Sequence, residues 1–250
     1  MDNYEKILAL KVFNFKDLCN LIGNENSAKS LLKNMLQKNY VKKIKYNLYA
    51  VCDLEYKNPI PSPYMIGSKI KEDSCISYHS AFEYYGAKNQ VFYLIYVSSK
   101  KNFEEFEFEG YTYTYINNKY DFGIINDGKI RVTDKERTVI DCIDKTEFAG
   151  GHEELILCLE LMGTLDGNKI LEYLSNYNSK KLYAKVGFML ELLKSVFGVE
   201  KEVIKECKRK SENLKYYFDN ETKAAKNKYI KDWNLIVPEI FVKRGETLYW

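Results

Sequence analysis

The sequence predicts neither a membrane-spanning segment nor an export signal. A transmembrane helix needs about 20 consecutive apolar residues, and the best local runs, Val91–Val97 and Leu155–Met162, are much shorter. The second run also contains Glu160. Residues 1–12 include two acidic residues and lack the small-residue cleavage site that ends a secretory signal. We therefore expect a soluble, cytoplasmic protein without a membrane partner.

Cysteine pairs with the spacing of zinc ligands are also missing. The sequence has six cysteines and only two histidines, and no two cysteines are spaced like the ligand pairs of structural zinc sites. Free and mostly buried thiols in a reducing compartment are therefore expected at Cys19, Cys52, Cys75, Cys142, Cys158 and Cys207. The chain also lacks a glycine-rich phosphate-binding loop. We expect neither a metal nor a cofactor.

The composition excludes intrinsic disorder of the whole chain. The chain has 250 residues, of which 46% are hydrophobic, and a formal net charge of +3. This is enough apolar material for a buried core, and the length favours two domains, or three. The segment 59–63 holds three of the four prolines and marks a boundary. We expect a domain over residues 1–58 and a second over 59–250, divided into an α+β part (59–148) and a mainly helical part (149–250).

Charge is distributed unevenly along the chain. Residues 1–58 hold ten lysines and six acidic residues, and residues 201–231 hold ten basic and five acidic residues. Between them, residues 59–200 hold sixteen basic and twenty-one acidic residues. The two basic regions could meet phosphates or an acidic partner. Charge alone does not distinguish such contacts from scattered, solvated lysines.

The first 58 residues predict three helices followed by a hairpin. Asn14 is placed to cap the start of the second helix, and Gly23 is placed to end it. The first helix contains Tyr4, Ile7 and Leu8 and either ends there or extends to Lys11–Val12. The other expected elements are helices over residues 15–22 and 26–37 and strands over residues 40–44 and 48–51.

The third of these helices has one apolar and one polar face. Its apolar residues recur at i, i+3, i+4, i+7 and i+8, which forms one stripe: Ala28, Leu31, Leu32, Met35 and Leu36. The order helix, helix, turn, helix, hairpin is typical of a winged helix-turn-helix, whose third helix enters the DNA major groove. The sequence therefore predicts an α+β protein in which an N-terminal winged helix-turn-helix precedes a mixed α+β domain with a helical C-terminal part.

The polar face of the third helix suits base recognition. Hydroxyl and amide side chains can bond base edges, and the best candidates are Ser27, Ser30, Asn34 and Gln37. Lysines in the hairpin can contact backbone phosphates. The expected DNA-binding residues are Asn26, Ser27, Lys29, Ser30, Lys33, Asn34 and Gln37 in the helix and Lys42, Lys43, Lys45, Tyr46 and Asn47 in the hairpin. No arginine, the usual guanine reader, occurs in residues 1–58. The alternative is a small protein-interaction module with an ordinary polar face.

The middle of the chain mixes helix and strand patterns. Thr133 is placed as a helix cap, with Glu136 reaching back to it. Arg137 and Asp141 are four residues apart on that helix and can form an ion pair. The expected elements are helices over residues 64–70 and 77–86, a strand over 90–98, a strand or hairpin over 106–116, a hairpin around 126–128, and a helix after 133.

Two groups in this region could be catalytic. His79 lies among serines and close to Glu83, but one helix does not by itself place a serine, a base and an acid as a triad. Asp134, Glu136 and Asp141 could bind magnesium, although capping and ion pairing explain them more simply. We expect that the protein is not an enzyme, and a phosphoryl-transfer or nuclease-like activity remains an alternative.

Several segments together match one family pattern. They are Ser77–Gly86, Asn89–Phe92, Tyr96–Ser99, Val132–Asp141 and Gly150–Leu155. Taken together they resemble the AbiEi-type antitoxins of the AbiE abortive-infection toxin–antitoxin systems. The predicted winged helix lies in the N-terminal place expected for that family. It ends in Asn47–Val51, where asparagine replaces the usual turn glycine, and asparagine tolerates the left-handed conformation.

The resemblance implies a DNA-binding antitoxin that represses its own operon. Such a protein would bind repeats in double-stranded DNA upstream of the operon and counteract a cognate nucleotidyltransferase-type toxin in phage defence. The resemblance further implies that neutralisation does not require a stable complex with the toxin. The region after the winged helix would provide the antitoxin activity.

The C-terminal third is predicted to be helical from about His152 to Leu214, including one helix over residues 180–197. An extended tail is predicted over residues 233–250. A basic surface in this region is either a solvated helix face or a contact for nucleic acid or an acidic partner. Its members, which we assign to the antitoxin surface, are Lys205, Lys208, Arg209, Lys210 and Lys215. A protein-interaction scaffold is the remaining alternative to a DNA-binding regulator.

Overall fold

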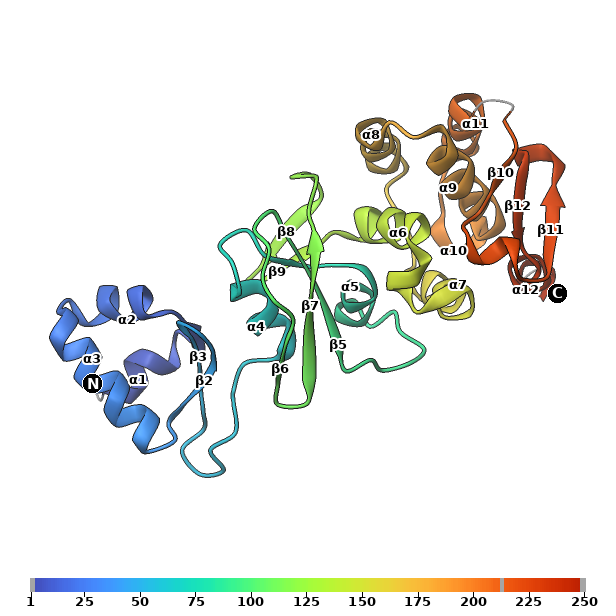
Figure 1. Ribbon diagram of the computed structural model, residues 1–250. Coiled ribbons are helices and arrows are strands. Elements are labelled where there is room, and N and C mark those ends of the chain that lie inside the picture. The colour runs from blue at the N-terminus through green and yellow to red at the C-terminus, as the bar shows by residue number, and fades with distance from the viewer. Residues whose placement is uncertain (1–2, 212–213, 248–250) are drawn as a thin grey trace. The chain divides into compact units, whose positions relative to one another are not determined.

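The computed structural model describes residues 3–211 and 214–247 and shows a mixed α+β fold (Figure 1). Contacts divide the chain into two compact units. Unit 1 contains the described residues within 1–76, 93–119 and 126–131, and unit 2 contains those within 77–92, 120–125 and 132–250. The chain therefore passes between the units several times. The boundary expected at residue 58 stays a prediction.

Unit 1 begins with three helices beside a small antiparallel sheet (Figure 1). The strand order in this sheet is β1-β3-β2. The elements are α1 (Asn3–Leu8), β1 (Val12–Phe13), α2 (Phe15–Ile22), α3 (Glu25–Gln37), β2 (Val41–Lys45) and β3 (Leu48–Val51). The first helix therefore does not extend to Lys11–Val12, because Val12 lies in β1 and pairs with Ala50 of β3.

The start and end of α2 follow the sequence signals. The side chain of Asn14 accepts a hydrogen bond from the backbone N–H of Asp17, whose carboxylate accepts one in return from the N–H of Asn14. This reciprocal pair satisfies two of the amides that a helix start leaves without partners. Gly23 ends the helix at a φ of 78°, a left-handed conformation in which glycine has no steric cost.

The larger sheet has the strand order β6-β7-β5-β4-β9-β8. In this sheet β5 and β7 are parallel, and β4–β5 and β6–β7 are antiparallel. The bounds are β4 (Cys75–Ile76), β5 (Leu94–Ser99), β6 (Phe106–Phe108), β7 (Tyr111–Asn117), β8 (Ile124–Asp127) and β9 (Ile130–Thr133), and α4 (Pro63–Lys69) precedes them. Gly67 of α4 leaves no room for a Cβ, because Ile76 and Val97 pack directly against it.

Unit 2 is mostly helical. Its helices are α5 (Tyr78–Tyr84), α6 (Lys135–Asp144), η1 (Thr146–Ala149), α7 (Gly151–Leu161), α8 (Gly167–Tyr177), α9 (Lys180–Leu192), α10 (Lys194–Phe197), α11 (Lys201–Ser211), η2 (Glu221–Lys223), η3 (Lys231–Trp233) and α12 (Glu239–Thr247). A three-stranded sheet completes the unit in the order β10 (Tyr216–Tyr217), β12 (Leu235–Pro238), β11 (Asn227–Ile230). Helix α9 packs against α6, α8 and α11.

A glycine in α9 permits a close contact with an aromatic ring. The ring of Trp233 lies directly over Gly187, where a Cβ would overlap it and would also lie 2.8 Å from the Cβ of Cys207. The indole N–H of Trp233 donates to the carboxylate of Glu191 at 2.6 Å. This glycine therefore lets a large buried side chain pack against the helix backbone.

Three sequence expectations for unit 2 are wrong. Asp134, and not Thr133, caps α6, because its carboxylate accepts from the N–H of Arg137 at 2.9 Å while Thr133 ends β9. Helix 180–197 is interrupted at Leu193, which has non-helical dihedrals and a fully buried side chain. The tail is not extended throughout: α12 follows β12, with Phe241 buried against Phe218. Residues 248–250 of that expectation lie outside the described residues.

The expectation of free and mostly buried thiols is confirmed. All six cysteines are free thiols, and every one except Cys19 is buried. Within the described residues, no helix combines the length and the apolar character needed to cross a bilayer.

Candidate nucleic-acid interface

Helix α3 is held in unit 1 by one buried face. Ala28, Leu32 and Met35 lie in a core cluster with Phe13 and Leu18. The helix begins at Asn24, whose side chain accepts from the N–H of Ser27 at 2.9 Å. The apolar stripe predicted from the sequence therefore faces the core, which directs the remaining side chains of α3 to solvent.

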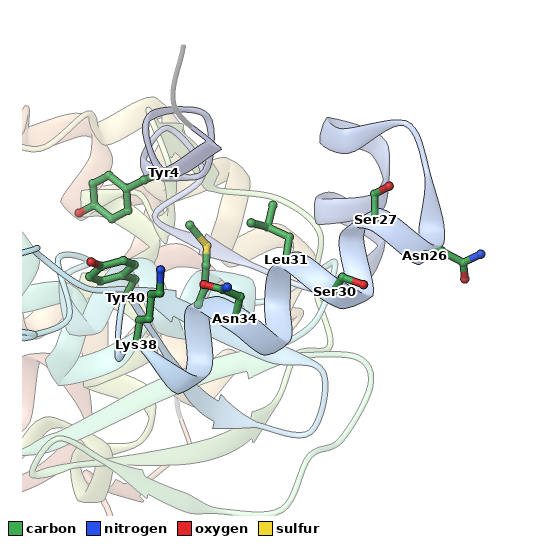
Figure 2. A pocket seen from close by; sticks show the side chains of 9 residues that line it. Tyr4, Asn26, Ser27, Ser30, Leu31, Asn34, Lys38 and Tyr40 are labelled. Carbon is green, nitrogen blue, oxygen red and sulfur yellow. The ribbon is translucent and has the colours of Figure 1, made fainter.

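The polar face of α3 is exposed along its whole length. All seven residues expected there to contact DNA are exposed, namely Asn26, Ser27, Lys29, Ser30, Lys33, Asn34 and Gln37. Figure 2 shows the side chains of Ser27, Ser30 and Asn34 spaced along α3, with Tyr4 and Tyr40 beyond its C-terminal end. Together with Lys38 they line an open groove of about 800 Å³. The groove offers hydroxyl and amide groups, which are the groups that bond base edges.

The lysines of this helix differ in their partners. Lys29 forms an ion pair with Glu25 one turn earlier, at 2.7 Å, and both side chains are mostly exposed. An exposed pair of this kind contributes little to stability, so a phosphate could replace Glu25. Among the described residues, Lys33 has no ion-pair partner.

The hairpin β2–β3 holds two of its lysines against the protein. Lys42 pairs with Glu109 at 2.7 Å. The ammonium of Lys45 lies 4.4 Å from the ring centroid of Phe106, and burial, followed by the positive charge of Lys71, lowers the pKa of Lys45. Lys43 is exposed and has no ion pair among the described residues. Of the three hairpin lysines, Lys43 is thus the one most open to a phosphate.

The turn of the hairpin is fixed by asparagine. Asn47 has a φ of 54°, the left-handed conformation expected for it. Its side-chain oxygen accepts from the N–H of Phe15 at 2.9 Å, which ties the turn to the start of α2. Tyr46 beside it is 89% exposed. The hairpin therefore presents Tyr46 on a turn that is anchored to the helical core.

The basic residues of the predicted antitoxin surface are exposed on and after α11. Arg209 pairs with Glu206 at 2.6 Å, and Lys205 lies 3.7 Å from Glu202. The ammonium of Lys208 lies over the ring of Trp233, and that of Lys215 over the ring of Tyr229. The positive charge of this surface is thus partly balanced by neighbouring acids.

Several segments that resemble the antitoxin family meet at one carboxylate in unit 2. Glu154 of α7 accepts from the Nε2 of His79 at 3.0 Å and from the N–H of Gln90 at 3.0 Å. It also accepts from the backbone and side-chain nitrogens of Asn89, both at 3.2 Å. Glu83 on α5 accepts from the N–H of Phe92 at 2.9 Å. Two carboxylates therefore hold the segment 89–92 against α5 and α7.

The electrostatics of this cluster favour a neutral histidine and an ionised glutamate. Burial lowers the pKa of His79. Burial alone would raise the pKa of Glu154, but the hydrogen bonds from His79, Gln90 and others outweigh it and lower this pKa to about 2. With the Nε2 proton directed at Glu154, the Nδ1 of His79 has no hydrogen-bond partner. The pair thus acts as a charge-assisted hydrogen bond in the core.

This cluster also contains possible metal ligands. The donor atoms of His79, Glu154 and Cys158 lie within 4.8 Å of one another, and all three residues are buried. Nitrogen, oxygen and sulfur donors of this kind suit Zn²⁺. The carboxylate, however, already accepts hydrogen bonds through both of its oxygens, so it has a complete structural role without an ion. Sequence spacing could not reveal the group, since His79 and Glu154 are 75 residues apart.

The three acids considered as a magnesium group have separate partners. Asp134 caps α6 and accepts from the hydroxyl of Tyr173 at 2.7 Å. Glu136 accepts from the backbone N–H of Asp166, the residue that caps α8, at 2.9 Å. The sequence predicted instead that Glu136 would reach back to the start of its own helix. Asp141 pairs with Arg137 at 3.2 Å, as the sequence predicted. These carboxylates connect α6 to its neighbours.

Comparison with known proteins shows a shared fold only. No protein-family model matches the sequence, and no curated protein matches it significantly. Among solved structures, the crystal structure of the RV2827C protein from Mycobacterium tuberculosis is similar, with a TM-score of 0.64 and 11% sequence identity. The match covers 94% of this chain and 89% of that chain. At this identity the likeness extends to the architecture and not to binding or activity.

Unit 2 also buries a lysine that the sequence did not single out. Lys185 of α9 is 1% exposed and donates to the backbone carbonyl of Asp144 at 2.8 Å. Its ammonium lies 4.6 Å from the ring centroid of Phe218. Burial lowers its pKa to about 8. The apolar residues next to Lys185 in α9 could have predicted its burial, because a lysine that lies on the inward face of a helix is buried with that face.

Proposed function

We propose that this chain is a DNA-binding antitoxin and autorepressor of the AbiEi type. Its first 58 residues would act as a winged helix-turn-helix, with α3 as the recognition helix and β2–β3 as the wing. The observation that supports this most is the exposure of every hydroxyl, amide and amine on the outer face of α3, while the opposite face is fixed in the core.

The assignment gives each exposed group a chemical task. Ser27, Ser30, Asn34 and Gln37 would bond base edges in the major groove, where asparagine and glutamine can contact adenine with two hydrogen bonds. Lys33 and Lys43 would neutralise phosphates from the helix and from the wing. On DNA binding, Lys29 would leave its ion pair with Glu25 and contact a phosphate instead. Lys42 and Lys45 keep their protein partners and would contribute less than the sequence suggested.

The antitoxin half of the proposal concerns unit 2. The chain would counteract a nucleotidyltransferase-type toxin without forming a stable complex with it. What supports this is the sequence resemblance, together with the convergence of its segments on Glu154, since that arrangement gives the motif residues a common structural role. The basic residues along α11 are the candidates for the antitoxin surface, and Lys210 has no ion pair among the described residues.

The DNA assignment is tested by a variant on the outer face of α3. Asn34→Ala should reduce the preference of the protein for its own upstream DNA over a scrambled duplex, because one bidentate base contact provides about 1–3 kcal/mol of discrimination. Asn102→Ala is the matched control, since Asn102 is also exposed and belongs to the same unit. Equal discrimination by the two variants would mean that α3 does not read bases.

The antitoxin assignment is tested by growth rescue. Co-expression of the full chain with the proposed nucleotidyltransferase-type toxin should restore growth of cells that the toxin arrests. Replacing Lys208, Lys210 and Lys215 by glutamine should weaken rescue and leave DNA binding unchanged. Rescue that is insensitive to these changes would remove the α11 surface from the proposal, and a lack of rescue by the unaltered chain would contradict antitoxin function.

A second candidate function is a protein-interaction module. It is favoured by a groove of about 420 Å³ between α2 and α3, lined by Phe15, Leu32 and Leu36 and the stems of Lys29 and Lys33. An apolar groove on a helical face can accept an amphipathic helix. If the protein shows no salt-sensitive DNA binding but binds a protein partner specifically, this function would be favoured over DNA recognition.

A further inference from the structure

A second large cleft in unit 1 lies next to the wing turn. Its volume is about 970 Å³. One wall is the turn Lys45–Asn47, and another is the end of α4 with the residues that follow it. The hairpin of β8 and β9 forms a third part of the lining, through Asn126, Gly128, Lys129 and Arg131. The cleft is separate from the outer face of α3, which lines a different groove.

Positive charge converges on this cleft from four separate parts of the chain. Its lining includes six basic residues and only two acidic ones, Asp17 and Glu72. The basic residues are Lys16, Lys45, Lys69, Lys71, Lys129 and Arg131. The carboxylate of Asp17 is already used in the cap of α2. Among the described residues, no acidic side chain forms an ion pair with any of the six.

The basic groups affect one another. Burial lowers the pKa of Lys129, and the nearby positive charges of Lys11 and Lys69 lower it further. The pKa of Lys45 is lowered in the same way, by burial first and then by the charge of Lys71, while Glu104 opposes the shift. Like charges held together with few counter-charges destabilise the folded state. A ligand that supplies negative charge would relieve this repulsion.

Arg131 adds a donor without an acceptor. Its Nη1 donates to the backbone carbonyl of Glu72 at 2.8 Å, which orients the guanidinium. Its Nε is buried and has no hydrogen-bond partner. Buried donors normally have an acceptor, and an anion bound in the cleft would supply one. The guanidinium is therefore positioned by the protein and only partly satisfied by it.

We propose that this cleft binds phosphates of the DNA backbone beside the wing. The inference rests on the proposed function, because it extends the contact of α3 and the wing to the α4 and β8–β9 segments. Six cations from four segments exceed the charge of one small anion, whereas duplex DNA presents one negative charge for about every 1.7 Å of its axis. The wall shared with the wing turn, where Tyr46 is 89% exposed, makes the cleft continuous with that contact.

The test compares two triple variants of the full chain. The cleft variant replaces Lys69, Lys71 and Lys129 by glutamine. The control variant makes the same change at three exposed lysines outside the cleft, Lys101, Lys119 and Lys201. Both lose the same net charge. Binding of a mixed-sequence duplex of about three helical turns is measured by fluorescence anisotropy across a salt series, because phosphate contacts do not depend on sequence.

The slope of log affinity against log salt concentration measures the number of phosphate contacts. Each lost phosphate contact reduces its magnitude by about 0.9, so the cleft variant should show a slope smaller by about 2–3 than the control variant and a lower affinity. Duplex binding should also protect Lys69, Lys71 and Lys129 from acetylation by acetic anhydride, measured by mass spectrometry. Equal slopes for the two variants, with the lysines unprotected, would overturn the cleft proposal and leave DNA binding by α3 standing.

Two further outcomes are separable. If the unaltered chain binds no duplex at any salt concentration, both the proposed function and the cleft contact fail. If inorganic tripolyphosphate protects the three lysines but the duplex does not, the cleft binds a small polyanion and the assignment to DNA is wrong.

Discussion

Replacing Glu154 by glutamine changes one charge and almost no volume, at the point where the segment 89–92 is held against α5 and α7. The native carboxylate accepts from His79, Gln90 and both nitrogens of Asn89. Glutamine keeps one acceptor oxygen and introduces an NH₂ group that faces donors. We therefore expect Glu154→Gln to lower the free energy of unfolding and to loosen the segment 89–92.

The magnitude follows from the pKa. The pKa of Glu154 lies at about 2 instead of 4.5, and each unit corresponds to about 1.36 kcal/mol. Because the folded-state pKa is depressed, this stabilisation is fully present above pH 4.5 and is lost as the pH falls towards 2. The variant should therefore be less stable than the native protein by about 3 kcal/mol at neutral pH. The difference should shrink below about pH 4.

Urea unfolding at a series of pH values measures the difference, and hydrogen exchange at the amides of Asn89 and Gln90 localises it. Glu153→Gln is the matched control, because Glu153 is exposed on the same helix. The control should change neither stability nor exchange appreciably. Equal stabilities for the two variants at neutral pH, or a difference that does not depend on pH, would refute the reasoning.

Three other predictions concern the core of unit 2. Gly187→Ala should destabilise the protein by about 1–3 kcal/mol, because the new methyl group overlaps the ring of Trp233; a thermal unfolding midpoint unchanged from the native value would contradict this packing. Arg137→Met should cost about 3–5 kcal/mol by leaving Asp141 buried without its partner, and the double variant with Asp141→Asn should recover part of that loss in urea unfolding. Burial lowers the pKa of Lys185 from 10.5 to about 8 in the folded state. As the pH rises, the folded state therefore loses this proton before the unfolded state does. The free energy of unfolding should rise by about 3 kcal/mol between pH 8 and 10.5. Lys185→Met should abolish this rise, and an unchanged pH profile in the variant would show that another group causes it.

The features that the sequence predicted correctly depend on local spacing. The apolar stripe of α3, the cap at Asn14 and the pair Arg137–Asp141 each involve residues a few positions apart on one helix. Helix geometry alone places such residues on the same face or at the same end. These predictions therefore needed no knowledge of the tertiary structure.

The failures have tertiary causes. Thr133 and Asp134 are both acceptable helix caps, and the choice depends on where β9 ends. Helix α12 could not be distinguished from an extended tail, because its formation depends on burial of Phe241 in unit 2. In the same way, the sequence predicted Lys42 and Lys45 as free lysines of the hairpin. It could not show that the fold places Glu109 beside Lys42 and Phe106 beside Lys45.

The two most informative sites could not be found in the sequence at all. Glu154 meets His79 and Asn89 across 75 and 65 residues, and the basic cleft collects charges from segments around positions 16, 45, 70 and 130. Most of the basic residues of the cleft even belong to the stretch 59–200, whose net charge is negative. Net charge along a sequence does not show where the fold concentrates it.

The measurement that tests the central proposal most directly is binding of the full chain to its own upstream DNA, beside a scrambled duplex, across a salt series. We expect tighter binding to the upstream DNA at every salt concentration, with a steep loss of affinity as salt rises. Equal affinity for both duplexes, or no binding to either, would contradict the assignment of α3 as a recognition helix.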